Sequence, residues 1–203
     1  MPDRTLVIET ATAACSVALI EAGQVLAERH ELVGRGHAER LVPMIAELPD
    51  GGRAARILVD VGPGSFTGIR VGIAAARGLG LGWGATVHGM SSLALVAAAA
   101  GGAGPLAVVL EGGHGELFMQ AFATSPLAPA GELLSLPPAA VRERAAGLRL
   151  VGDGVRWLDS PDPRAAPRGA LPRAADAVLL PPALAQLAPR PLYGRAPDAK
   201  APG

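Results

Sequence analysis

Cysteine, lysine and aromatic residues are scarce in this chain of 203 residues. Cys15 is its only cysteine, so no intrachain disulfide can form, and with no recognisable signal peptide the sequence predicts a cytosolic protein. Aromatic residues make up 3% of the chain, whereas hydrophobic residues, mostly Ala, Leu and Val, make up 50%. This composition excludes general disorder and predicts a core of small, closely packed side chains.

The chain also has no excess of positive or negative charge. Eighteen basic residues balance eighteen acidic ones, so the chain has no strong field to attract nucleic acid by itself. The long apolar stretch 71–110 is interrupted by Arg77, His88 and repeated glycines. These interruptions predict buried helices and strands, with no membrane-spanning helix.

Signals for metal binding and for catalysis are absent. No two of the four histidines are three or four residues apart, and none lies beside a CxxC pair, so we predict neither a metal site nor a catalytic residue. Glu9 and Glu111 each end an apolar strand at matching places of the two halves. In a two-lobed nucleotide-binding fold such acids would hold a metal and water. A carboxylate that caps a turn is the simpler interpretation of each.

Hydrophobic periodicity predicts an alternation of strands and helices in the first half. Pro43 lies inside the first helix and should kink or shorten it. We expect strands at 5–9, 15–21, 24–31, 56–61 and 86–89, and helices at 37–48, 69–81 and 91–100, the last with Ser91 as its N-cap.

The second half begins much as the first does, with an apolar strand ending in Glu, a small-residue turn and another strand. VIETATAACSVAL and VVLEGGHGELFMQ share this pattern, which indicates a weak internal duplication. A boundary at 101–104 divides the chain into lobes 1–102 and 103–203, each an α/β unit. We expect strands at 105–111, 116–123 and 148–152, helices at 141–146 and 176–187, and a flexible Pro-, Ala- and Arg-rich loop at about 160–173.

The loop GPGSFTG, residues 62–68, joins a strand to a helix. It is no Walker phosphate loop, because Ile69 and Arg70 stand where Lys and Ser or Thr are needed, and Pro63 excludes a nucleophile elbow. A tight turn in which Ser65 or Thr67 caps the helix is the favoured interpretation. The alternative is an anion or nucleotide site at the helix N-terminus, formed by Gly62, Gly64, Ser65 and Thr67.

The helix after this loop has small residues every four positions, at Gly68, Gly72, Ala76 and Gly80. Each Gly costs roughly 1 kcal/mol relative to Ala in a helix, so close packing must compensate. Spacing alone leaves two possibilities equal: packing on the lobe's own sheet, or packing on a partner chain.

Several segments in order resemble the TsaB family of bacterial tRNA threonylcarbamoyladenosine biosynthesis proteins. They are ETATAACSVAL, GHAERLVPMI, GPGSFTGIRVGIAAARGLGLG, VHGMSSL, EGGHGELF and PLYGRAPDAK. The resemblance implies an actin-like ATPase fold of two related lobes, each with a mixed sheet and helices. It also implies a non-catalytic subunit that binds the catalytic paralogue TsaD and the small ATPase TsaE. That complex uses ATP to add a threonylcarbamoyl group to the adenosine next to the anticodon of tRNAs reading ANN codons.

In the family the helices at 37–48 and 69–81 form the heterodimer bundle, which favours the partner interpretation of the small-residue stripe. The resemblance implies tRNA contact through the complex, self-association of the chain when alone, no membrane and no tightly bound cofactor. The implied interface residues are His37, Leu41, Met44, Ile45, Gly68, Ile69, Arg70, Gly72, Ile73, Ala76 and Arg77.

Two departures from the family weaken any case for nucleotide binding. Glu9 stands where the family usually has Asp, and EGGHGE stands where it usually has Asp-Ala-Arg-x-Gly-Glu. Two alternatives to the scaffold role remain: an ATP-binding phosphotransferase-like enzyme of the same superfold, and a peptidase-like protein.

Overall fold

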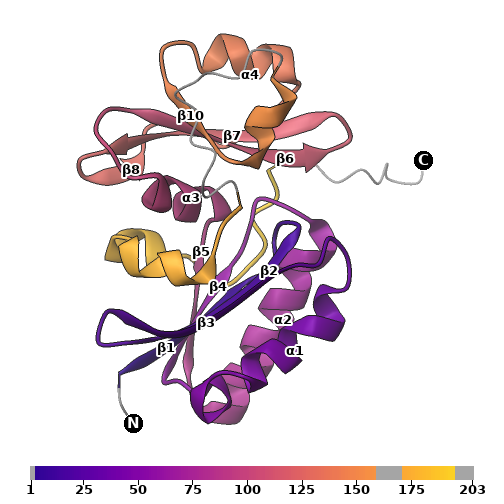
Figure 1. The fold of residues 1–203 in the computed structure, drawn as a ribbon, viewed down its shortest axis with the longest axis vertical. Helices are drawn as coiled ribbons and strands as arrows, with labels where there is room; N and C mark the ends of the chain where they lie inside the picture. The colour runs from indigo at the N-terminus through magenta and orange to yellow at the C-terminus, as the bar shows by residue number, and fades with distance from the viewer. Residues whose placement is uncertain (1–2, 159–170, 195–203) are drawn as a thin grey trace.

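The first lobe is built on a five-stranded sheet of order β3-β2-β1-β4-β5 (Figure 1). The computed structural model describes residues 3–158 and 171–194. The strands β1 and β2 pair antiparallel, as do β2 and β3, whereas β4 and β5 follow β1 in parallel. The sheet is therefore mixed, as predicted. Its strands are β1 (Arg4–Glu9), β2 (Ala14–Glu21), β3 (Gln24–Leu32), β4 (Arg56–Asp60) and β5 (Thr86–Met90).

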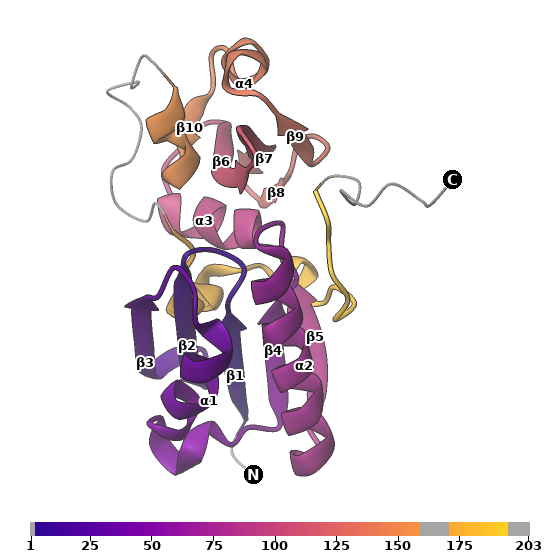
Figure 2. The ribbon, with the colours of Figure 1, turned by 90° about the vertical axis from the view of Figure 1, so that its right-hand side faces the viewer.

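Two helices, α1 (His37–Ala46) and α2 (Phe66–Trp83), lie side by side on one face of this sheet (Figure 2). Pro43 lies inside α1, which ends two residues earlier than expected and is followed by the 3₁₀ turn η1 (Pro49–Gly52). Among the described residues, no helix is long and apolar enough to cross a membrane. The core under the helices contains Leu6, Ile8, Val17, Leu19, Leu41, Met44, Ile45, Ile57, Val59, Ile69, Ile73 and Ala76.

The second lobe repeats the strand arrangement of the first, which confirms the predicted duplication and the two-lobed α/β class. Strand β6 pairs antiparallel with β7 and parallel with β10, as β1 pairs with β2 and β4. Sequence patterns missed two strands of three residues each, β8 and β9. The elements are β6 (Leu106–Gly113), β7 (Glu116–Thr124), β8 (Leu127–Pro129), β9 (Leu134–Leu136), α4 (Pro138–Arg144), β10 (Arg149–Val151) and η2 (Asp153–Trp157).

Helix α3 (Ser92–Ala100) lies between the two sheets and joins their cores. Leu93 and Val96 pack with Leu106 of the second sheet, whereas Leu95 packs with Leu58 of the first. Ser91 is its N-cap by position, but the Ser91 hydroxyl makes no capping hydrogen bond. Because α3 contributes to both cores, the lobes share a continuous apolar contact.

The helix predicted at 176–187 is wrong. Two short 3₁₀ turns, η3 (Ala174–Leu179) and η4 (Pro182–Ala185), take its place because Pro181 and Pro182 interrupt the hydrogen-bond ladder. Both turns pack on the first sheet, and Leu187 pairs with Gly89 on its edge strand. Residues 174–187 therefore contact the first lobe, although they follow the second lobe in the sequence. Most of the predicted loop at 160–173 lies outside the described residues.

The small-residue stripe of α2 faces the lobe's own sheet. A Cβ atom on Gly68 would overlap the carbonyl oxygen of Thr10, and one on Gly72 would overlap the Thr10 hydroxyl. At Gly80 a Cβ would lie 2.6 Å from Val87 Cγ2. The glycines therefore let α2 lie unusually close to β1 and β5, which is the first of the two possibilities that spacing left open.

This packing predicts opposite effects at two glycines of α2. Gly72→Leu should lower the free energy of unfolding by about 3 kcal/mol or more, because the side chain has no space. Gly78 is exposed with no atom within 4 Å of a Cβ, so Gly78→Ala should raise it by about 1 kcal/mol. Urea unfolding followed by circular dichroism measures both, and equal effects would contradict the packing.

Candidate functional site

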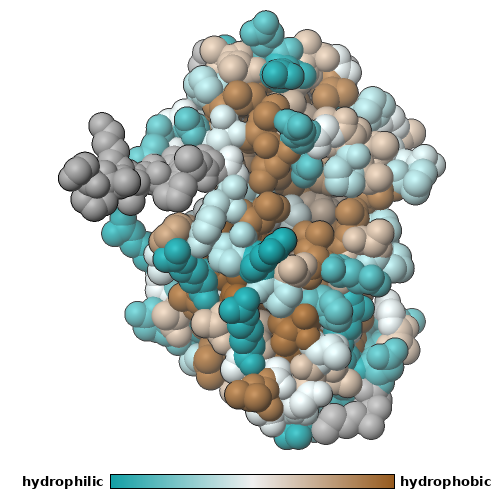
Figure 3. Space-filling view, turned by 180° about the vertical axis from the view of Figure 1, so that it is seen from behind, coloured by the Kyte–Doolittle hydropathy of each residue, from teal (hydrophilic) through white to brown (hydrophobic). Residues whose placement is uncertain are grey.

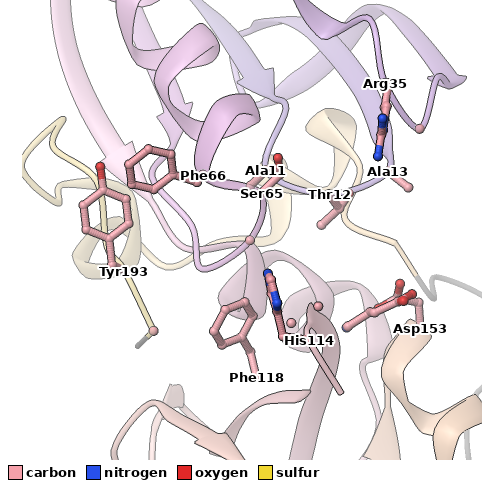
Figure 4. A pocket seen from close by; sticks show the side chains of 16 residues that line it. Ala11, Thr12, Ala13, Arg35, Ser65, Phe66, His114, Phe118, Asp153 and Tyr193 are labelled. Carbon is pink, nitrogen blue, oxygen red and sulfur yellow. The ribbon is translucent and has the colours of Figure 1, made fainter. Parts of the chain in front are cut away.

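A cleft of about 800 Å³ opens between the two lobes (Figure 4). Three backbone turns contribute to its wall: the β1–β2 turn, the β6–β7 turn and the loop at the start of α2. In Figure 4 the side chains of Ser65 and Thr12 come from the first lobe and those of His114 and Asp153 from the second. The cleft is lined by 11–13, 34–35, 64–66, 111–114, Phe118, Asp153, Tyr193 and Gly194.

The β1–β2 turn is held by a buried carboxylate of the chain itself. Glu9 Oε1 accepts hydrogen bonds from the backbone N–H groups of Ala11, at 2.8 Å, and Thr12, at 3.2 Å. Backbone amides of such a turn are the groups that would cradle a phosphate in a nucleotide site. Here Glu9 already occupies them, which confirms the turn-capping interpretation of this residue.

The β6–β7 turn is also held by internal contacts. The backbone N–H of Glu111 donates to Asp153 Oδ1 at 3.1 Å, and the Glu111 carboxylate pairs with Arg156. Burial raises the pKa of Asp153 above its ordinary value. Glu111 therefore acts in an ion pair at the cleft edge instead of capping its own turn, so that prediction is wrong.

The loop at 62–68 is a helix cap packed against the β1–β2 turn. Ser65 Oγ accepts from the N–H of Gly68 at 3.2 Å, and the N–H of Ser65 donates to the carbonyl of Ala11 at 2.6 Å. Gly62 is buried and its N–H donates to Asp60 Oδ1 at 2.7 Å. These contacts confirm Ser65 as the cap and use the N–H groups of Gly62, Ser65 and Gly68 inside the lobe.

The four residues of the alternative anion-site prediction lie in different surroundings. Gly64 and Ser65 do line the cleft, whereas Thr67 is exposed and is absent from the cleft wall. A Cβ on Gly64 would overlap the carbonyl oxygen of Ala11. Gly64 lets the β1–β2 turn approach closely, whereas a phosphate-binding loop would use a glycine to let the ligand approach.

Sequence analysis missed Asp60, which is fully buried at the end of β4 beside Glu9 at the end of β1. Asp60 Oδ1 also accepts from the Ser92 hydroxyl at 2.9 Å, while Asp60 Oδ2 and Glu9 Oε2 have no hydrogen-bond partner. Burial raises the pKa of Asp60 to about 7. Burial and the nearby charge of Asp60 raise the pKa of Glu9 well above its ordinary range. The sequence signal for Asp60 was an acidic residue at the end of an apolar strand.

The predicted interface residues lie mostly inside the lobe. His37 Nε2 donates to the carbonyls of Thr12 and Ala14 at 2.9 and 3.0 Å, so it fastens α1 to the β1–β2 turn. Like His37, most of the predicted interface residues are buried in the chain itself and lie beneath the exposed surface of α1 and α2. The buried set is His37, Leu41, Met44, Ile45, Gly68, Ile69, Gly72, Ile73 and Ala76.

Arg70 and Arg77 are the two predicted interface residues that are exposed. The Arg70 guanidinium lies 3.5 Å from the centroid of the Phe66 ring, and its Nε donates to the Tyr193 hydroxyl at 3.0 Å. Arg77 Nη2 donates to the carbonyl of Pro189 at 2.7 Å. Both arginines thus hold the C-terminal segment against α2.

The chemistry available in the cleft is limited. Within residues 3–158 and 171–194, no group of three His, Cys, Asp or Glu side chains is arranged to hold a metal ion. The buried acids Glu9 and Asp60 are used by the turns they support. The arrangement stabilises the junction between β1, β4 and α2.

Asp60 makes the stability of the fold depend on pH. In the folded state it holds its proton up to about pH 7, whereas its ordinary pKa is 3.8. The folded state therefore binds more protons between these values, and the free energy of unfolding should fall as the pH rises from about 4 to about 7. Asp60→Asn should remove about 3 kcal/mol of this decrease. Urea unfolding at pH 5 and pH 8 tests this, and equal decreases in both proteins would contradict it.

The model of a protein family, TsaD: tRNA N6-adenosine threonylcarbamoyltransferase, matches residues 25–125. The TsaB protein of Escherichia coli is 38% identical over 125 residues, 57% of this chain and 53% of that protein. The TsaB protein of Haemophilus influenzae is 41% identical over 100 residues, 47% and 42% of the two chains. Both are described as tRNA threonylcarbamoyladenosine biosynthesis proteins, and the matches span about half of their length.

Two solved structures extend the similarity over most of the chain. YeaZ from Pseudomonas aeruginosa is 30% identical with a TM-score of 0.74, covering 87% of this chain and 90% of that one. A second structure, described as an uncharacterised protein similar to peptidase YeaZ of the same organism, has a TM-score of 0.77 at 28% identity. It covers 95% of this chain and all of that one. The lobes, their order and the shared motifs agree, and the chain belongs to the TsaB/YeaZ family.

Proposed function

We propose that this chain is a non-catalytic subunit of the cytosolic complex that modifies the adenosine next to the anticodon in tRNAs reading ANN codons. In this complex it binds and supports TsaD, which transfers the threonylcarbamoyl group to N6. Membership of the TsaB/YeaZ family supports the pathway. The observation that carries the non-catalytic role is Glu9, whose carboxylate occupies the turn amides that a nucleotide phosphate would need.

The alternative enzyme functions gain no support from the geometry. A phosphotransferase of this superfold would need free backbone donors at its phosphate turns, and here Glu9 occupies the N–H groups of Ala11 and Thr12 while Ser65 occupies that of Gly68. A metallopeptidase would need a cluster of metal ligands, and the described part of the chain has none. ATP is then used by the other subunits, TsaD and TsaE.

The outward faces of α1 and α2 are the surface best suited to bind TsaD. The two helices are neighbours on one face of the first sheet (Figure 2). Several of their small or apolar residues are exposed to solvent. Leu81 is 88% exposed and Val42 is 58% exposed, so a partner that covers both would remove apolar surface from water. We call this surface the docking face; its residues are Ala38, Val42, Thr67, Ala74, Gly78 and Leu81.

Small side chains at the centre of the docking face allow a partner helix to approach closely. Gly78 has open space around it, and Ala74 lies one turn before it. Side chains of a partner helix can pack against such small residues, which allows a short distance between the helix axes. From behind, the space-filling view shows apolar side chains interspersed with hydrophilic ones on the lower lobe (Figure 3). The same face would serve for self-association when TsaD is missing.

An arginine at the centre of the docking face should prevent pairing with TsaD. Ala74 is exposed, so Ala74→Arg should leave the free energy of unfolding within about 0.5 kcal/mol of the wild type. The bulky charge should weaken binding at least tenfold, because helix packing would bury it. Ala139→Arg, on the exposed surface of α4, is the matched control. Size-exclusion chromatography with TsaD measures pairing, and an intact heterodimer with Ala74→Arg would show that the face is wrong.

Depletion of the chain should lower threonylcarbamoyladenosine in bulk tRNA. Complementation with the Ala139→Arg variant should restore the modification, whereas complementation with Ala74→Arg should not. Nucleoside mass spectrometry measures the level directly. Unchanged modification after depletion would remove the proposed function.

A further inference from the structure

Two aromatic rings and three arginines come from α2 and from the C-terminal segment that contacts it: Phe66, Arg70 and Arg77 from α2, and Arg190 and Tyr193 from the segment. Phe66 and Tyr193 are 50% and 40% exposed, and their rings stack with centroids 5.2 Å apart and 25° between planes. Arg70 covers Phe66 and donates to the Tyr193 hydroxyl, which fixes the orientation of the stack. Arg77 and the exposed Arg190 lie along the same segment. We call these five residues the Arg–Tyr surface.

The positive charge of the Arg–Tyr surface is not neutralised. Neither α2 nor residues 181–194 contain an Asp or Glu, and none of the described carboxylates forms a salt bridge with Arg70, Arg77 or Arg190. Five other arginines, Arg4, Arg29, Arg40, Arg156 and Arg173, each form a salt bridge. In a chain of zero net charge, α2 and residues 181–194 thus carry three arginines and no acidic residue.

The contacts of these arginines leave donors for a ligand. Arg77 uses Nη2 on the Pro189 carbonyl, and a guanidinium has five N–H donors in all. The backbone N–H of Arg190 donates to the carbonyl of Ala188 at 2.8 Å, whereas its exposed guanidinium makes no hydrogen bond among the described residues. Unpaired arginines beside exposed, pre-oriented aromatic rings are the combination that binds single-stranded nucleic acid, with phosphates on the arginines and a base stacked on a ring.

We propose that the Arg–Tyr surface binds single-stranded nucleotides of the tRNA substrate, a role that rests on the proposed function of the chain. Arg77 and Arg190 hold phosphates, and the outer face of the Tyr193 ring stacks on a base. An acidic protein segment would satisfy the arginines but would make little use of the stacked rings, so RNA fits better. The balanced total charge makes this binding weak for the isolated chain and useful within a complex.

The test measures binding of an unmodified transcript of a tRNA reading an ANN codon to the complex with TsaD, over a range of salt concentrations. The double variant Arg77→Gln, Arg190→Gln should raise Kd about tenfold and lower the slope of log Kd against log salt by about one. Tyr193→Leu should raise Kd about tenfold, and Tyr193→Trp should keep affinity because it retains a stacking ring.

Arg53→Gln is the matched control, because Arg53 is also an exposed arginine. It lies before the first residue of β4, whereas Phe66 of the Arg–Tyr surface lies after the last residue of that strand. Unchanged tRNA affinity in the double variant and in Tyr193→Leu would overturn the inference. Loss of TsaD binding in these variants would also overturn it and assign the surface to a protein interface. Binding of the tRNA by the isolated chain is measured in parallel. If the wild type never pairs with TsaD, the proposed function fails. The inference is then decided by whether tRNA binding to the isolated chain is lost in the Arg77 and Tyr193 variants.

Discussion

The contact between the β1–β2 turn and the start of α2 determines what this protein can do. The Glu9 carboxylate accepts hydrogen bonds from backbone N–H groups of the turn. The turn also supplies the Ala11 carbonyl, which accepts from the backbone N–H of Ser65. Gly64 and Gly68 are required because the carbonyls of Ala11 and Thr10 occupy the space of a Cβ atom. The N–H groups of Ala11, Thr12 and Ser65 are used here to join β1 to α2.

This junction also sets which surfaces remain for partners. Because the small-residue stripe packs against the sheet, α2 lies close to the core and its opposite side faces outward. The outward side exposes Ala74 and Gly78, and its Arg70 and Arg77 contact the C-terminal segment. One helix thus presents an apolar face suited to helix packing and a positive edge suited to phosphates.

The sequence predicted the fold well where hydrophobic patterns were long. The strands of the first sheet, α2 and the duplicated opening of the second half were found within a few residues, because apolar runs and turn residues define them locally. The helix expected at 176–187 failed because its apolar residues contact the first sheet without helical periodicity. Two strands of three residues were too short to show a pattern.

The site was harder to predict, because spacing identifies the face of a helix but not its direction. Gly72 and Ala76 were correctly grouped, yet only the three-dimensional contact with Thr10 and Val59 shows that they point inward. Asp60 and Tyr193 depend on residues far away in the chain: Asp60 on Ser92, and Tyr193 on Arg70. No local motif records such partners.

Hydrogen exchange on mixing with TsaD tests the central claim most directly, that this chain acts by docking a partner through α1 and α2. Exchange should slow in 37–46 and 66–83 and stay unchanged in the strands of the second lobe. Unchanged exchange in both helices, or slowing confined to the second lobe, would contradict the account.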